Sequence, residues 1–348
     1  MSSDRRTFLK IAGATALAGS AVDLAMGQGP ARTYIPHTSW DCGMKEGIPS
    51  PEGGVLLFEV PVSLDRVAKI GKTPYGNRRV AVGLESKVSS PKLSATVMTG
   101  ALDLELTLSN GTVEIEDYLV FKTDDGKYIY SRSAGVGAGA KDVRVAMDFE
   151  APNGSTVEWL NTGKYVARRV LDENAKTLTL RVYDVSNVAL KSDAASTIRI
   201  AKPDGVAPQP WNYRQKDPAE KQGKELIIES VGLSPSQRVG PSKRGTRNII
   251  PITGGEINGR IIGKILAGGA DYQNLSAPPA IDARYLWQAS DGEVIIVRNT
   301  TSAAGGLVPT FEARADGPYA YLNTGLFLSS NPGFANGGVK ITMYESTK

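Results

Sequence analysis

The chain has very little of the two residue types that most often carry catalysis and metal binding. It contains one cysteine, Cys42, and one histidine, His37. A single cysteine cannot form an internal disulfide, and one cysteine with one histidine cannot build a Cys/His zinc cluster. Any catalytic triad would have to use His37. Acid–base chemistry therefore falls mainly to Asp, Glu, Tyr, Lys and Arg, and no metal site is expected.

Excess charge and long apolar runs are also scarce. The 40 basic residues nearly balance the 36 acidic ones, and part of the net charge of +4 lies in the first ten residues. No basic stripe alternates with aromatic residues, so we expect no nucleic-acid partner. Hydrophobic residues make up 41% and charged residues 22% of the chain, which is typical of a globular protein.

The N-terminus resembles a twin-arginine export signal over residues 1–27. Arg5 and Arg6 precede Phe8-Leu9-Lys10, and a mildly apolar run follows. That run is too short and too interrupted for a comfortable transmembrane helix, so no membrane span is expected. Ala25-Met26-Gly27 offers a small-residue cleavage site. We expect a periplasmic or secreted protein; the alternative is a cytoplasmic protein with a frayed basic terminus.

Two irregular segments separate the patterned parts of the chain. Residues 28–53 are rich in glycine and proline breaks and form a leader, which could drape over a barrel mouth or serve as a simple tether. Residues 188–223 turn polar and contain several prolines, so we interpret them as a linker. Within the linker, Thr197–Ile200 could add a short strand.

The remaining sequence alternates between apolar and polar residues with the period of a β-strand. Leu104-Glu105-Leu106 and Leu180-Arg181-Val182 are examples, and turn signals such as Ser109-Asn110-Gly111 fall between such runs. No segment carries a sustained helical period. The glycine pairs at 254–255 and 268–269 are not followed by Lys-Ser/Thr or a helix, so they are not phosphate loops. We expect no cofactor.

The pattern then occurs twice in the same order. Five anchors recur, which indicates a tandem duplication of a β-domain of about 125 residues. The matches are Gly76-Asn77-Arg78 with Gly245-Thr246-Arg247, residues 93–103 with 261–271, 125–129 with 291–295, Phe149-Glu150 with Phe311-Glu312, and 159–163 with 321–325.

These residues resemble a known family, the single-domain lipocalin-like barrels of microbes, which are catalogued only as a domain of unknown function. The first repeat departs from the pattern, because Tyr118 stands in the place of Arg284 and residues 85–87 replace the first glycine pair. The resemblance implies two tandem antiparallel β-barrels at 54–187 and 224–348, and it implies little about chemistry. The second repeat carries the resemblance at Gly254, Gly255, Gly268, Gly269, Asp271, Asp282, Arg284, Tyr285, Phe311, Glu312 and Asn323.

Recurring carboxylates are the first candidates for catalysis. Asp271, which recurs as Asp103, would be a general base, or else a turn residue bonding nearby backbone. Glu312, which recurs as Glu150, would be a buried acid or base, or else a surface residue. Amphipathicity places Tyr285 and Trp287 inside and leaves Arg284 in solvent; the opposite orientation would make Arg284 an anion clamp.

The predicted site therefore lies in the second barrel. Its catalytic residues are Glu312, Asp271, Arg284 and Tyr285; its substrate-binding residues are Asn323, Trp287, Tyr321, Arg298 and Tyr272; and the first-repeat equivalents are Asp103, Tyr118, Glu150 and Asn161. Asn323 and Asn161 could equally orient backbone.

Three functions remain open. The leading hypothesis is cofactor-independent acid–base chemistry on a small organic substrate by an isomerase, lyase or hydrolase. The rivals are a small-molecule carrier without turnover and a structural protein with plugged barrels. An enzyme would place a titratable pair inside a barrel, whereas a carrier would show an apolar cavity with few polar groups. The expected partner is a small-molecule ligand, and a homo-oligomer is left open.

Overall fold

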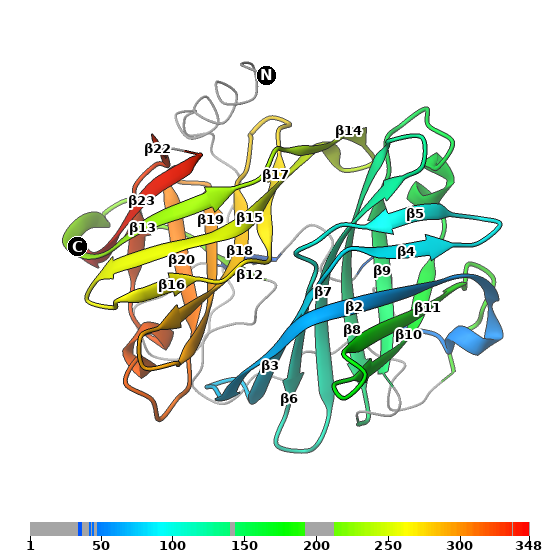
Figure 1. Ribbon diagram of the computed structural model, residues 1–348, viewed down its shortest axis with the longest axis horizontal. Coiled ribbons are helices and arrows are strands. Elements are labelled where there is room, and N and C mark those ends of the chain that lie inside the picture. Colours follow the sequence, from blue (N-terminus) through cyan, green and yellow to red (C-terminus); the bar gives the residue numbers. More distant parts are fainter. Residues whose placement is uncertain are drawn as a thin grey trace.

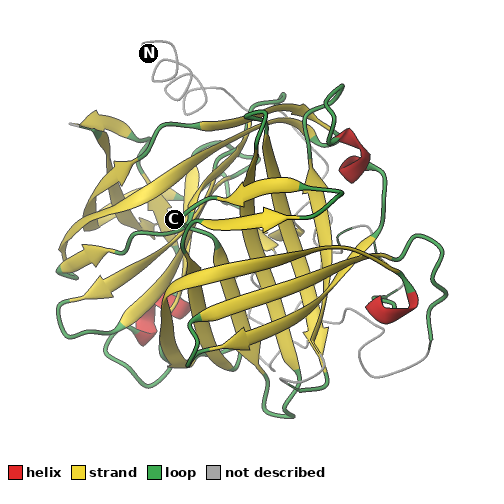
Figure 2. Ribbon diagram, turned by 45° about the vertical axis from the view of Figure 1, so that its right-hand side comes forward, coloured by secondary structure: helices red, strands yellow, loops and turns green. Residues whose placement is uncertain are grey.

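The computed structural model describes residues 34–36, 42, 44, 47–139, 143–191, 212–335 and 337–347. In this part of the chain the protein forms two closed antiparallel β-barrels, as expected from the sequence, and they lie side by side (Figure 1). The helical elements of the described residues are three short 3₁₀ turns, Pro51–Gly53, Glu158–Asn161 and Ala320–Asn323, and strands and loops make up the rest of this part of the chain (Figure 2). The export signal and the predicted strand Thr197–Ile200 lie outside the described residues.

The first barrel closes eight strands in the order β7-β6-β3-β2-β11-β10-β9-β8, with β8 pairing back to β7. Two short strands, β4 and β5, extend the sheet from β7. The bounds are β2 (Val55–Lys72), β3 (Asn77–Gly83), β4 (Ser86–Ser89), β5 (Ser94–Val97), β6 (Leu102–Thr107), β7 (Val113–Thr123), β8 (Tyr128–Gly137), β9 (Val143–Glu150), β10 (Tyr165–Asp172) and β11 (Thr177–Asp184).

The second barrel repeats this plan and closes where β23 pairs with β13. Its bounds are β13 (Lys221–Leu233), β14 (Gln237–Ser242), β15 (Gly245–Gly259), β16 (Gly263–Ile265), β17 (Ala270–Asn274), β18 (Asp282–Ala289), β19 (Val294–Thr301), β20 (Leu307–Glu312), β21 (Phe327–Ser329), β22 (Gly333–Ala335) and β23 (Gly338–Thr347). A separate two-stranded sheet joins β1 (Tyr34–Pro36) in the leader to β12 (Asn212–Arg214) in the linker.

The lost glycine pair has a visible structural consequence. In the second barrel, β15 runs unbroken through Gly254 and Gly255, whose φ angles are +124° and +149°. A Cβ on Gly255 would lie 2.0 Å from the carbonyl oxygen of Ser230, so only glycine fits this bend. In the first repeat Glu85 falls at this point, and the equivalent stretch is divided into β3 and β4.

Each barrel buries its own apolar core, because alternate residues of every strand point inward. Val60, Leu119 and Phe149 belong to the first core, and Tyr285, Trp287 and Phe311 belong to the second. A third apolar cluster joins strands of both barrels and includes Val82, Tyr118, Tyr130, Tyr272 and Leu286. The outer faces of the two barrels therefore form a third core between them.

Polar contacts across this interface are reciprocal. Arg78 of the first repeat donates to Glu312 of the second over 2.8 Å, and Arg247 of the second donates to Glu150 of the first over 2.6 Å. A hydroxyl supports each pair at the same position of each repeat: Thr73 donates to Glu312 and Ser242 donates to Glu150.

The backbone repeats this exchange. The Ala315 N–H donates to the Lys72 carbonyl, and the Asn153 N–H donates to the Pro241 carbonyl. The barrels therefore pack about a pseudo-two-fold axis, in the manner of an isologous dimer.

Candidate functional site

The interior of the second barrel holds a carboxylate that the sequence analysis missed. Glu229 lies on β13 between Ile227 and Val231, and the period of two turns all three side chains inward. The comparison of the two repeats did not point to Glu229, because strand register places Val60 at the corresponding position of the first barrel. The available signal was a glutamate at an inward position of an otherwise apolar strand.

Glu229 reaches across the barrel interior to β18. The Tyr285 hydroxyl donates to its two oxygens over 2.8 and 2.9 Å, and the Trp287 Nε1–H donates over 2.6 Å. Tyr285 and Trp287 point inward as the amphipathic pattern of β18 predicts. These contacts tie opposite walls of the barrel together through one fully buried carboxyl group.

Asp271, a predicted catalytic residue, lies on β17 inside the same barrel. One oxygen accepts a hydrogen bond from Gln273 Nε2 at 2.7 Å, and the other accepts the backbone N–H of Asp282 at 3.1 Å. Gln273 in turn accepts from Asn248 at 2.8 Å. The backbone bond crosses between strands β17 and β18, so Asp271 is a sheet residue rather than the turn residue of the alternative interpretation.

Both carboxyl groups have their pKa near neutrality. Burial raises the pKa of Glu229 to about 7, against the opposing effect of the bonds from Tyr285 and Trp287. Burial also raises the pKa of Asp271 to about 7, and the charge of Asp282 adds to the increase. No ion pair with Arg or Lys reaches either group within the described residues. A buried carboxyl without a cation behaves in this way because its charged form loses solvation.

Two other predicted catalytic residues lie outside the barrel interior. Arg284 points outward from β18 and is buried against the first barrel, with Asp282 and Glu116 as ion-pair partners. The expectation that it is solvated is therefore wrong, and so is the idea that it faces the interior. The outward face of β18 is polar because the neighbouring barrel supplies matching charges.

Glu312 is buried in the same interface rather than in a barrel. Burial alone would raise its pKa, but the guanidinium groups of Arg78 and Arg298 outweigh this effect and hold the pKa below its ordinary value. A carboxylate fixed by two arginines is a weak proton acceptor. The structure thus corrects the assignment of Glu312 as acid or base.

The remaining predicted residues divide between the interface and backbone support. Tyr272 and Tyr118 stack across the interface with ring centroids 4.8 Å apart. Asn323 forms two hydrogen bonds with the backbone of Ala313, and Asn161 does the same with Ala151. Both asparagines thus make the backbone contacts of the alternative in which they orient the backbone. Tyr321 lies under the guanidinium of Arg260, at 4.0 Å, away from Glu229 and Asp271.

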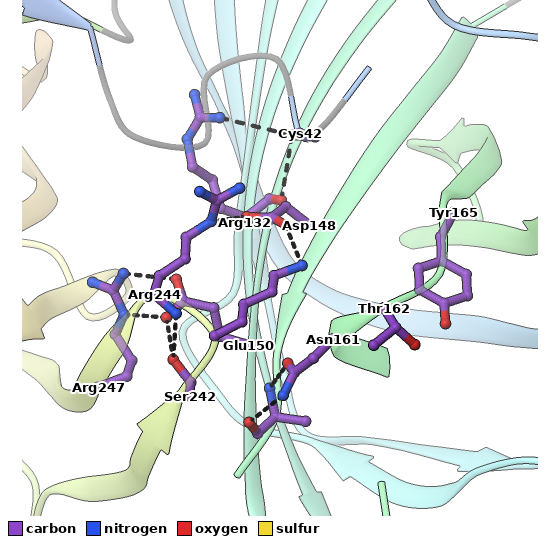
Figure 3. A network of polar contacts seen from close by, with 12 residues as sticks. Cys42, Arg132, Asp148, Glu150, Asn161, Thr162, Tyr165, Ser242, Arg244 and Arg247 are labelled. Atoms are coloured by element: carbon purple, nitrogen blue, oxygen red, sulfur yellow. Dashed lines mark hydrogen bonds and ion pairs between the residues drawn. The ribbon is translucent and has the colours of Figure 1, made fainter. Parts of the chain in front are cut away.

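The interface network extends to the leader (Figure 3). Arg244 donates to Asp148 over 2.7 Å, beside the Arg247–Glu150 pair. The Cys42 thiol lies against Arg132, 3.8 Å from its Nη1. Of the described leader residues, Cys42, Met44 and Ile48 pack on the outer face of the first barrel, where Cys42 covers the buried Arg132.

The first barrel has a different interior. Asp103, the equivalent of Asp271, forms a close ion pair with Arg169 and faces Asp117 across β6 and β7. Asp117 corresponds to Ala283 of the second barrel, and the sequence analysis missed it because it does not recur.

A cleft of about 820 Å³ opens between the barrels rather than inside one. Its lining comes from β2 of the first barrel and from β15, β16, β18 and β19 of the second, and it includes Arg66, Lys69, Lys264 and Gly254. Within the described residues, no three His, Cys, Asp or Glu side chains converge as metal ligands. No described helix has the length and apolar character needed to cross a membrane.

A family model described as "Protein of unknown function (DUF3237)" matches residues 54–148 and 227–306, about half of the chain and part of each barrel. The chain belongs to the DUF3237 family. Two matches in tandem agree with the duplication that the sequence anchors predict.

Individual relatives of this DUF3237 protein are similar over shorter stretches. A UPF0311 protein of Bradyrhizobium diazoefficiens is 44% identical over 57 residues, and one of Rhodopseudomonas palustris strain TIE-1 is 45% identical over 58 residues. Each match covers 16% of this chain and 38% of the relative.

Solved structures were also compared with the chain. A conserved protein of unknown function from Rhodopseudomonas palustris aligns with a TM-score of 0.33 and 21% identity, covering 37% of this chain and 95% of that one. A beta-barrel like protein from Acinetobacter baumannii AYE aligns with a TM-score of 0.33 and 21% identity, covering 38% and 94%.

Proposed function

We propose that the interior of the second barrel is a small-molecule site for proton-transfer chemistry. The observation that carries the proposal is the pair formed by Glu229 and Asp271. Both are buried in one interior, neither has a cationic partner in the described residues, and both have a pKa of about 7. General acids and bases work best when their pKa lies near the operating pH.

The geometry favours an uncharged substrate that carries a carbonyl group. An ionised substrate would meet no opposite charge in this interior, whereas a protonated carboxyl group of Glu229 or Asp271 would donate to a carbonyl oxygen. One carboxylate would remove a proton next to the carbonyl, and the other, protonated, would return a proton elsewhere. The net reaction is an isomerisation that consumes no cofactor.

Hydrogen–deuterium exchange tests this chemistry without knowledge of the natural substrate. The full chain is incubated in D₂O with a panel of small ketones, and exchange next to the carbonyl is followed by NMR. We expect catalysed exchange for at least one ketone, and its loss in both Glu229→Gln and Asp271→Asn. Glu256→Gln, an exposed change on β15, is the matched control and should exchange as the wild type does.

A carrier function is the second candidate, and the inter-barrel cleft favours it. A volume of about 820 Å³ is within the range of small-molecule sites, and Lys264 contributes a positive charge, whereas Arg66 and Lys69 pair with Asp65 and Glu173. Saturable binding of an anionic ligand that is lost in Lys264→Ala, without any exchange activity, would favour the carrier. Absence of both binding and exchange would favour a structural protein.

We further propose that the protein is exported by the twin-arginine route. Support comes from Arg5, Arg6 and the apolar run that follows them. Replacing both arginines by lysine should trap the precursor in the cytoplasm, and this is read by fractionation and immunoblotting. Unchanged recovery outside the cytoplasm would contradict the proposal.

A further inference from the structure

The interior of the first barrel holds three carboxyl groups and two guanidinium groups. Asp103 and Glu105 come from β6, Asp117 from β7, Arg79 from β3 and Arg169 from β10. All except Arg79 are almost completely buried. Strand register places the three carboxyl groups on the inner face together with core residues such as Ile115 and Leu119.

The two arginines neutralise only two of these carboxylates. Arg169 donates to Asp103 over 2.6 Å and lies 2.9 Å from Glu105, and Arg79 forms a two-point contact with Glu105 at 2.8 Å. Within the described residues, no ion pair joins a cation to Asp117. Asp117 is therefore the carboxyl group in excess.

Asp117 hydrogen-bonds to Asp103, but two hydroxyl groups beside it have no hydrogen-bond partner among the described residues. Ser133 lies directly opposite Asp117 in the β7–β8 register, and Ser131 lies two residues further on the same inner face. Both serines have no exposed surface, and neither hydroxyl has a hydrogen-bond partner among the described residues. Buried polar atoms almost always find a partner, so neighbouring unsatisfied hydroxyl groups indicate bound water or a small ligand.

We propose that the first barrel binds a small primary ammonium ion through Asp117, Ser131 and Ser133. A primary ammonium has three N–H donors, and these three side chains supply oxygen acceptors on one face of two neighbouring strands. The apolar side chains of Leu119 and Phe149 adjoin the serines in register and suit a short hydrocarbon tail. A bare divalent metal ion fits this site less well, because it prefers six or more oxygen ligands.

Binding should release a proton. Burial, together with the charge of Asp103 and a hydrogen bond between the two carboxyl groups, raises the pKa of Asp117 well above its ordinary value and so favours its protonated form before an amine binds. The arriving ammonium favours the carboxylate, and the proton leaves to solvent, so one cation enters and one proton departs. Affinity should therefore rise with pH. The charged groups around Asp117 are Asp103, Glu105, Arg79 and Arg169 inside the barrel and Glu116 on its own strand.

Calorimetric titration of the full chain with methylammonium and n-butylammonium chloride tests the proposal. We expect saturable 1:1 binding, with an apparent heat that differs between two buffers of different ionisation enthalpy by the amount for about one released proton. Asp117→Asn keeps the size of the side chain but cannot become anionic. It should weaken binding about 10- to 100-fold, as expected for loss of a charged hydrogen bond.

Control variants separate this site from the second barrel. Glu229→Gln should bind the amines normally, and Asp117→Asn should leave ketone exchange unchanged, so the two proposals fail independently. The ammonium site is wrong if no amine binds saturably in wild type, which would mean that water alone fills the interior. It is equally wrong if Asp117→Asn, with an unchanged melting temperature, binds as wild type, or if KCl displaces methylammonium at equal concentration.

Discussion

The two barrels make equivalent contacts on their outer faces, but their interiors differ. Outside, Arg78 meets Glu312 just as Arg247 meets Glu150. Inside, the first barrel is charged around Asp103, whereas the second is neutral around Asp271, the residue at the same position. Two copies of one fold thus shift the pKa of the same aspartate in opposite directions, below its ordinary value in the first barrel and up to about 7 in the second, because only the first copy provides an arginine for it.

This difference teaches how to interpret recurrence within a duplicated chain. The anchors Gly-x-Arg and Phe-Glu recur because each repeat must supply both halves of an interface with the other. Of the side chains that give each interior its chemistry, Asp103 and Asp271 recur, whereas Glu229 and Asp117 do not. The residues that recur therefore include those of the interface between the two domains, and the residues that distinguish one interior from the other do not recur.

The largest effect should come from breaking one reciprocal ion pair. Glu312→Ala leaves Arg78 and Arg298 without their buried partner, so we expect a loss of about 3–5 kcal/mol in the free energy of unfolding. Glu150→Ala should cost a similar amount if the interface is truly symmetric. Urea denaturation measures both, and a loss below about 1 kcal/mol in either would contradict the symmetry.

A second comparison contrasts the two interiors directly. Arg169→Met removes the cation paired with Asp103 and one of the two cations paired with Glu105, and it should destabilise by about 3 kcal/mol. Tyr285→Phe removes only a hydroxyl donor from Glu229 and should cost about 1 kcal/mol. Thermal unfolding of the two variants under one condition gives the ratio. Equal losses would mean that the interiors are not charged and neutral as described.

The pH dependence of stability should reveal the neutral interior. Glu229 and Asp271 bind protons more tightly in the folded chain, where the pKa of each is about 7, than in the unfolded chain, where the values are 4.5 and 3.8. Their contribution is therefore complete below about pH 4 and is lost as pH rises to about 7. The loss is at most about 1.4 kcal/mol per pH unit for each group.

The double variant Glu229→Gln/Asp271→Asn isolates this contribution. Its stability relative to wild type should increase between about pH 4 and 7, because amides do not titrate. Denaturant titrations across this range measure the difference. A constant difference would show that the two carboxyl groups titrate normally.

The last comparison concerns the paired asparagines. Asn161→Ala and Asn323→Ala each remove two hydrogen bonds to backbone, so we expect a loss of about 1–2 kcal/mol for each. Ketone exchange and amine binding should not change. Loss of exchange in Asn323→Ala alone, at normal stability, would restore its predicted role in substrate binding.

The sequence predicted the fold well and the site only in part. Period-two alternation and turn residues are local signals, so the barrels, the duplication and the inward orientation of Tyr285 and Trp287 could be derived. The surroundings of Arg284 and Glu312 could not, because alternation shows which face of a strand is polar but not whether a second domain covers it. Glu229 was missed because its partners lie across the barrel, more than fifty residues away.

The reciprocal contacts also constrain how this gene can evolve. Glu150 and Glu312 are each balanced by an arginine of the other repeat, so a substitution at one of these charges must be compensated in the opposite half of the same polypeptide. Fusion of the two repeats in one chain favours their association, because the linker holds them at a high effective concentration and guarantees equal numbers of each. The two halves of a fused chain do not have to be identical, as the subunits of a homodimer are. Their interiors can therefore acquire separate chemistry.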